Sequence, residues 1–227
     1  MKKHFILVVV LICCSFISRS QKWELKNISN IVAVSFPDSV KEQKQNDVQI
    51  FISQTATLVF AASLKEVKNN EVLQSEADLD SVYNATFKAL TDNGQWKLLS
   101  KEKIMAGNLK AMDAQLRYMQ FDTIPLYFYF RVICLNHIVY CLFVSKAIEF
   151  NSIELAAKDR FLNSFKVTSD SIKLIQFDSS AGNIAYNIAY KFGKLIGYLI
   201  VPLLIVLIIY GLRRFFKKNK KSPGNIE

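Results

Sequence analysis

The feature that most constrains this chain is an uncharged apolar run of eighteen residues near its C-terminus, Leu195–Leu212. A helix of this length extends roughly 27 Å, close to the thickness of the hydrocarbon layer of a bilayer. Six cations follow it directly, and the first four are Arg213, Arg214, Lys217 and Lys218. Cations beside a span favour the cytoplasm, so these four set the topology. The sequence therefore predicts a single-pass protein with a transmembrane helix over 195–212, a basic cytoplasmic tail over 213–227 and its N-terminal part outside.

Residues 1–20 are typical of a secretory signal peptide. Lys2 and Lys3 precede about a dozen apolar residues, and small side chains stand at Ser18 and Ser20, the positions that a signal peptidase reads. The apolar stretch is shorter than the roughly 17 residues that a spanning helix needs. We expect cleavage before Gln21. The alternative is lipoprotein processing, with Cys14 as the lipidated residue.

The net charge of +10 belongs to the residues that flank the two apolar segments. Between them, residues 21–190 contain as many acidic as basic side chains. A nucleic-acid-binding domain needs its cations on the folded surface that meets the phosphates. Cations that flank apolar segments are instead typical of a membrane protein. We therefore expect a cell-membrane location and no nucleic-acid partner.

Residues 21–168 are predicted to form one extracytoplasmic α+β domain, in which helices pack on an antiparallel β-sheet. Segments rich in β-branched and aromatic residues predict strands at 31–36, 48–53, 56–64, 95–104, 109–121, 126–135 and 138–146. Two helices should begin after Ser75 and Asn151, because each of these N-cap residues is followed three positions later by an acid. The first should continue through Leu90. Residues 169–194 then form a juxtamembrane linker or helix.

The order of these segments resembles the PsbP-like family over roughly residues 23–168. The similarity lies in an early strand end at Val34–Pro37, a mid-domain helix, a long antiparallel meander and a closing helix end at Phe161–Phe165. That family includes an extrinsic photosystem II subunit, a Ran-binding nuclear import factor and many bacterial secreted proteins. The resemblance implies an α/β/α sandwich with a binding or assembly role, here in the periplasm of a Gram-negative bacterium. It carries over no metal-site pattern.

Side chains suited to catalysis are sparse in this sequence. The mature chain has one histidine, His137, and no motif of serine hydrolases, zinc proteases, phosphate-binding loops or dithiol oxidoreductases. His137 falls at a predicted turn, where a histidine is ordinarily only a turn residue. We therefore expect no catalytic, cofactor-binding or metal-binding residues and no enzymatic activity. The alternative is an enzyme of unknown chemistry on the outer face of the membrane.

Cys134 and Cys141 are the thiols that remain after signal cleavage, and they face an oxidising compartment. Their pairing depends on the register of the predicted hairpin. With Asn136-His137 as a two-residue turn, Cys134 lies opposite Val139 and the two cysteines are diagonal neighbours, too far apart for a disulfide. A turn at His137-Ile138 would place them directly opposite each other. The sequence leaves open a disulfide and a pair of buried reduced thiols, and the second is the ordinary outcome.

Tyr127, Tyr129 and Arg131 alternate along one strand and therefore share one face of the sheet. If that face is open, its tyrosines and arginine form a candidate partner surface, because these residue types dominate binding hot spots. The alternative is a sheet covered by helices on both faces, since the opposite side of this strand is also apolar.

A row of small residues leads from the domain into the predicted span. Its members recur at every fourth position and are Ala181, Ala185, Ala189, Gly193 and Gly197. On a helix such a row allows a second helix to approach closely. It predicts a homo-oligomer or a contact with another membrane protein. It also supports an alternative function, a structural subunit of a membrane complex assembled through residues 181–197.

Overall fold

The computed structural model describes residues 22–45, 47–66, 73, 75–92, 94–120, 124–168, 174–176 and 193. The predicted signal peptide, the predicted span over 195–212 and the predicted cytoplasmic tail all lie outside the described residues. None of the helices formed by the described residues is long and apolar enough to cross a membrane.

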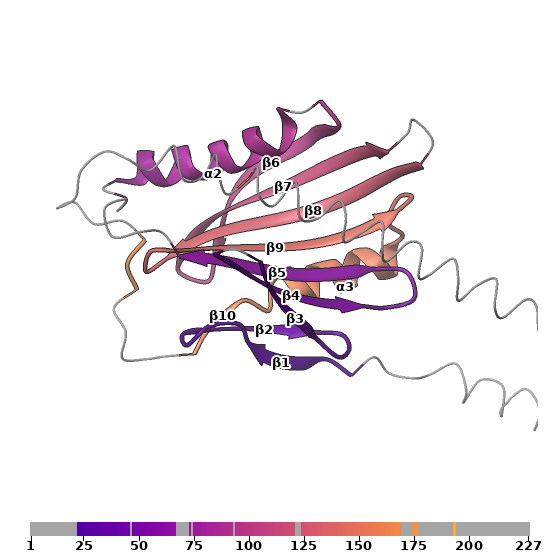
Figure 1. Cartoon of the computed structure of the whole chain (residues 1–227), viewed down its shortest axis with the longest axis horizontal. Helices are drawn as coiled ribbons and strands as arrows, with labels where there is room; N and C mark the ends of the chain where they lie inside the picture. Colours follow the sequence, from indigo (N-terminus) through magenta and orange to yellow (C-terminus); the bar gives the residue numbers. More distant parts are fainter. Residues whose placement is uncertain are drawn as a thin grey trace, which may run out of the picture.

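Strands dominate the described part of the chain. The elements are β1 (Glu24–Asn27), β2 (Val32–Phe36), β3 (Lys41–Gln45), β4 (Val48–Gln54), β5 (Val59–Glu66), α2 (Glu76–Thr91), β6 (Trp96–Ala106), β7 (Leu109–Gln120), β8 (Ile124–Leu135), β9 (Ile138–Ala147), α3 (Ser152–Leu162) and β10 (Lys166–Val167). Seven strands form one sheet in the order β3-β4-β5-β9-β8-β7-β6, and β1, β2 and β10 form a second sheet (Figure 1). The paired strands are antiparallel throughout. The prediction of an antiparallel α+β domain is therefore confirmed.

Both predicted helices are present, and both begin with the reciprocal capping arrangement that the sequence indicated. The Ser75 side chain accepts a hydrogen bond from the Asp78 backbone N–H, and the Asp78 carboxylate accepts one from the Ser75 backbone in return. Asn151 and Glu154 do the same at the start of α3. Each box satisfies two amide groups that the first turn of a helix would otherwise leave without a partner.

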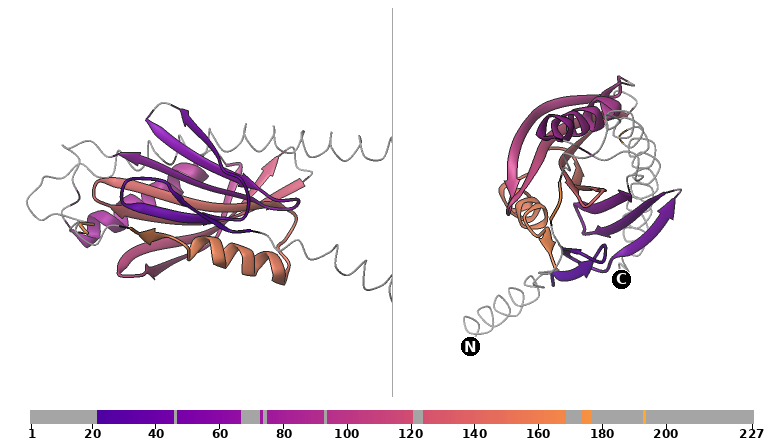
Figure 2. Two further views of the ribbon diagram at one scale, coloured as in Figure 1. Left: turned by 90° about the horizontal axis from the view of Figure 1, so that it is seen from below. Right: turned by 90° about the vertical axis from the view of Figure 1, so that its left-hand side faces the viewer.

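The two faces of the large sheet carry separate apolar cores. On one face lies α2, whose Leu79, Val82, Phe87 and Leu90 are buried against the sheet. Along its outer side α2 forms two ion pairs with neighbouring strands, Asp80 with Lys103 of β6 and Glu76 with Lys110 of β7. The Lys101 ammonium of β6 also donates a hydrogen bond to the Asn84 side chain of α2. The right-hand view of Figure 2 shows the large sheet curving around the α2 side.

The opposite face is covered by α3 and the small sheet. Phe161 of α3 packs edge-on against Phe36 of β2 and Phe60 of β5, with ring centroids 5.3 Å apart in both pairs. These rings join the three layers into one core. The large sheet therefore stands between α2 on one side and α3 with the small sheet on the other, as in an α/β/α sandwich.

Candidate binding surface

The predicted partner face of β8 lies on the α3 side of the large sheet. Its three residues, Tyr127, Tyr129 and Arg131, differ in their contacts within the fold. Arg131 is 7 % exposed, and its guanidinium is held by a two-pronged ion pair with Asp113 of β7 at 2.7 and 2.8 Å. A third nitrogen donates to the Leu162 carbonyl and to the Asn163 side chain at the end of α3. Arg131 thus fastens α3 to the sheet and is not a free contact residue.

Tyr129 is also used within the fold. Its ring meets Phe150 edge-on, with centroids 5.0 Å apart, and the Lys158 ammonium lies 4.5 Å from the ring centroid. Burial, with the nearby carboxylates of Asp159 and Glu149, raises the pKa of the Tyr129 phenol above its ordinary value. Tyr127 is half-buried, as Tyr129 is, and its hydroxyl lies 3.5 Å from a Glu149 oxygen.

Tyr127 belongs to a row of side chains that crosses four strands on this face. The register places Lys97 of β6 opposite Arg117 of β7, Arg117 opposite Tyr127 of β8, and Tyr127 opposite Lys146 of β9. Directly opposite residues share a face and stand about 5 Å apart, so the row is about 15 Å long. We call Lys97, Arg117, Tyr127 and Lys146 the basic row.

The cations of the basic row are neutralised unequally. Lys146 forms a 2.6 Å ion pair with Glu154 and is mostly buried. Lys97 is exposed and has no ion pair among the described residues. Arg117 is half-buried, and its Nε is inaccessible to solvent and has no hydrogen-bond partner in the part of the chain that the structure describes. Like charges placed directly opposite on neighbouring strands repel each other, and a buried donor without a partner is costly. This end of the face is therefore suited to receive an anionic group.

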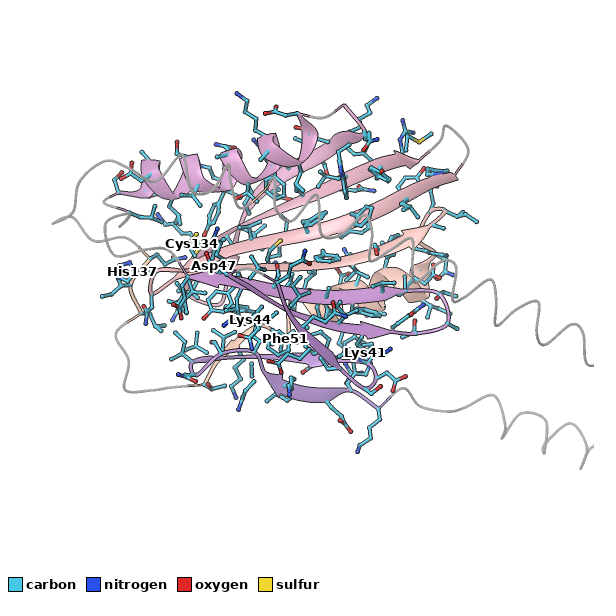
Figure 3. The ribbon with its side chains drawn as sticks, viewed as in Figure 1. Lys41, Lys44, Asp47, Phe51, Cys134 and His137 are labelled. Atoms are coloured by element: carbon cyan, nitrogen blue, oxygen red, sulfur yellow. The ribbon has the colours of Figure 1, made fainter. Side chains whose placement is uncertain are left out.

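Residues for other chemistry do not gather in the described part of the chain. No group of three or more histidine, cysteine, aspartate or glutamate side chains there could hold a metal ion. His137 is exposed at the turn between β8 and β9, where it and Asn136 both have positive φ (Figure 3). Two consecutive residues of this kind are typical of a tight two-residue hairpin turn.

The turn at Asn136-His137 fixes the register of the two cysteines. Cys134 lies opposite Val139 and Cys141 opposite Val132, so the two are diagonal neighbours, and both are free and buried. Burial raises the pKa of the Cys134 thiol to about 12, although a hydrogen bond with Tyr83 acts in the opposite direction. Burial also raises the pKa of the Cys141 thiol. Both thiols are therefore protonated and unreactive while the domain is folded.

The remaining predicted site residues lie almost wholly outside the described residues. Of the small-residue row, only Gly193 is described, and it has helical backbone and lies against α2. Ala181, Ala185, Ala189 and Gly197 fall outside, as do Arg213, Arg214, Lys217 and Lys218.

Lys97 and Arg117 are the candidate residues that sequence reasoning missed. Each occupies an alternating position on its own strand, but a row across strands exists only once the pairing is known. The signal that could have found them is the alternation on β7, which puts Asp113, Gln115 and Arg117 on the same face. A correct register for the β7–β8 hairpin would then have placed Arg117 beside Tyr127.

Comparison with known proteins supports the fold and not a specific function. No protein-family model and no curated protein matches the sequence. Among solved structures, a solution structure of cyanobacterial PsbP (CyanoP) from Synechocystis sp. PCC 6803 matches with a TM-score of 0.51 and 12% identity, covering 66% of this chain and 95% of that one. The domain has a PsbP-like fold. The Ran-binding protein Mog1p from Saccharomyces cerevisiae also matches, with a TM-score of 0.44 and 8% identity over 67% of this chain and 98% of that one.

Proposed function

We propose that this protein is a membrane-anchored extracytoplasmic binding or assembly module without enzymatic activity. The PsbP-like fold supports the type of domain. The apolar run over 195–212, the signal-like start and the basic tail support the anchoring and the topology. The proposal also places the protein in the cell membrane, with its domain in the periplasm. It includes no nucleic-acid partner.

The observation that carries the binding function is the charge of Lys97 and Arg117 in the basic row, which no ion pair among the described residues compensates. Arg117 and Lys97 stand directly opposite each other and have no ion pair among the described residues, while Arg131 and Lys146 on the same face are each paired with a carboxylate. Repulsion between the two cations lowers the stability of the free domain slightly, and a bound anion would remove that repulsion. Tyr127 adds an aromatic surface and a hydroxyl beside the two charges.

The partner that fits this surface is an acidic segment of another protein. A guanidinium recognises a carboxylate through two parallel hydrogen bonds, and an adjacent ammonium can hold a second carboxylate. Charge-assisted hydrogen bonds of this kind contribute about 1.5–3 kcal/mol each. Glutamates or aspartates spaced to meet Arg117 and Lys97 together would therefore be held specifically.

The test is the binding of a fluorescein-labelled glutamate-rich peptide to the full-length protein in detergent, followed by fluorescence anisotropy. We expect the double variant Lys97→Gln with Arg117→Gln to weaken binding by about tenfold or more, the equivalent of about 1.4 kcal/mol. The matched control is Lys41→Gln with Lys44→Gln, which removes two exposed cations from β3 at the opposite edge of the same sheet (Figure 3). Equal weakening by both double variants would show attraction by overall charge and would refute the basic row as a site.

A further inference from the structure

The connection between β9 and α3 exposes two large apolar side chains. Ile153 is 79 % exposed and Ile148 is 68 % exposed, more than any other large hydrophobic residue that the structure describes. Single exposed apolar residues are ordinary on a protein surface, but these two stand five positions apart in one short stretch. Such a pair indicates a contact surface.

Ile148 is also held in an unfavourable backbone conformation. Its φ is 77°, in the left-handed region that β-branched residues rarely adopt. Asparagine or glycine would fit this conformation better and would expose no large apolar side chain. Strained residues of this kind gather at binding sites.

Ile148 belongs to a row of residues that marks one end of the large sheet. The row begins before β6, where the Gln95 carbonyl accepts from the Met119 N–H. Met119 of β7 lies opposite Pro125 of β8, and the Pro125 carbonyl accepts from the Ile148 N–H. This end lies on the right in Figure 1 and in the left-hand view of Figure 2. We call this row, together with Ile153, the isoleucine end.

Ile153 leans out of the same end of the domain. The helix α3 begins there and runs inward, since Glu154 meets Lys146 near the end of β9, whereas Leu162 meets Arg131 farther along β8. In a helix the Cα–Cβ bonds tilt toward the N-terminus. Ile153 is the second residue of α3, so its side chain is directed away from the domain.

The chain returns to α2 close to this end, at Gly193. A Cβ atom at position 193 would collide with the Thr86 carbonyl oxygen and would lie 2.8 Å from the Ala89 Cβ, so only glycine allows the contact. Thr86 and Ala89 are in the last two turns of α2, which ends at Thr91, four residues before Gln95. Gly193 therefore lies near the part of α2 that leads into the isoleucine end.

The predicted membrane span begins two residues after Gly193, at Leu195. Two residues extend at most about 7 Å, so the predicted span starts within that distance of Gly193. The hydrocarbon layer would then begin beside the last turns of α2. The outer flank of α2 is charged there, with Lys88 exposed and Asp80 paired with Lys103 of β6. The isoleucine end exposes apolar side chains and is therefore the nearby surface suited to lie against lipid.

We propose that the isoleucine end docks on the lipid surface, with Ile148 and Ile153 inserted among the headgroups. The inference rests on the membrane anchoring proposed above and does not depend on the basic row. A single span alone leaves the domain free to tilt and rotate above the bilayer. Contact at a second point would fix its orientation.

The test uses a nitrobenzoxadiazole label on Ser152→Cys, an exposed position between the two isoleucines. The full-length protein is reconstituted in vesicles of phosphatidylethanolamine and phosphatidylglycerol, with and without a lipid that carries a spin label near its headgroup. We expect the spin-labelled lipid to quench about half of the emission or more, because an inserted side chain lies within about 5–10 Å of the boundary between headgroups and acyl chains. The same label on His137→Cys, exposed at the opposite end of β8, should keep its emission (Figure 3). The wild type, labelled in parallel, gives the background from native cysteines.

Removal of the two isoleucines should abolish most of the quenching at position 152. The variant is Ile148→Asn with Ile153→Asn, which keeps the fold because both residues are exposed and asparagine accommodates a positive φ. The matched control is Met105→Asn with Leu174→Asn, which removes two exposed apolar residues from the opposite end of the domain. This control should leave the quenching unchanged.

Flotation of the protein with the vesicles separates this proposal from the anchoring. Protein that does not float with the vesicles would refute the anchoring and the docking with it. Protein that floats while the label on Ser152→Cys keeps its emission would overturn the docking alone. Equal loss of quenching in both double variants would also overturn the docking, because apolar surface in general would then hold the domain on lipid.

Discussion

At the scale of single residues, the two arginines on the α3 face of the sheet differ in the residues that the strand register places beside them. Arg131 and Arg117 both point to the α3 side, from neighbouring strands. Arg131 stands opposite Asp113 and under the end of α3, whereas Arg117 stands opposite Lys97 and Tyr127. The first therefore stabilises the fold, whereas the second has no ion pair among the described residues. Composition and alternation along a strand cannot distinguish the roles of the two arginines, because these roles depend on residues of the neighbouring strands.

Removal of the acidic partner of Arg131 should destabilise the domain strongly. Asp113→Ala leaves a guanidinium that is 7 % exposed without its carboxylate, and we expect unfolding to become easier by about 2–4 kcal/mol. The measurement is urea denaturation followed by circular dichroism. The control is the double variant Asp113→Ala with Arg131→Met, which removes the unpaired charge and should recover part of the loss. A double variant as unstable as the sum of the single changes would contradict this account.

At the scale of elements, the sequence predicts best where the local signal is complete within one element. Both helices carried their capping boxes in the sequence, and the meander from β6 to β9 showed long runs of β-branched and aromatic residues. The strands missed by sequence reasoning are β1, β3 and β10. β3 reads Lys-Glu-Gln-Lys-Gln and is exposed throughout, so no apolar alternation marks it. It is a strand because it pairs with β4, and pairing is a property of two segments.

The N-terminus of α3 should confer a pH dependence on stability. Glu154 is buried, which disfavours its charged form, but hydrogen bonds from Lys146 and the Asn151 backbone outweigh burial and lower the pKa of Glu154 below its ordinary 4.5. A carboxyl whose pKa is lower in the folded state stabilises the fold above the unfolded value. That stabilisation is lost as the pH falls from about 4.5 through the folded pKa.

The measurement is the melting temperature between pH 7 and pH 3 for the wild type and for Glu154→Gln. We expect the variant to melt lower at pH 7 and the difference to shrink as the pH falls below about 4.5. Glu149→Gln is the control, because Glu149 lies nearby but outside the capping box, and it should leave the pH profile nearly unchanged. A difference between wild type and Glu154→Gln that stays constant down to pH 3 would refute the role of the carboxylate.

At the scale of the whole molecule, the sequence predicted the arrangement of layers and left open whether both faces of the sheet are covered. Two capped helices and a long antiparallel meander indicate an α+β sandwich, and the structure has one. For the face bearing Arg131, the sequence allowed either an open partner surface or a sheet covered on both faces. That face is largely covered, because Phe161 of α3 packs on Phe60 of β5 and Phe150, in the loop before α3, packs on Tyr129 of β8. What covers a face depends on loops and chain crossings that hydrophobic periodicity does not encode.

The topology that the whole chain implies can be measured with single cysteines placed on its two ends. Lys44→Cys lies on the exposed strand β3 of the domain, and Lys220→Cys lies in the predicted cytoplasmic tail. Because the native Cys134 and Cys141 are buried, a membrane-impermeant maleimide reports the added thiols. We expect Lys44→Cys to react in cells whose inner membrane is intact, and Lys220→Cys to react only after that membrane is permeabilised. The positive charge directly after 212 opposes transfer of the tail, so reaction of both cysteines before permeabilisation would refute a span with its tail inside.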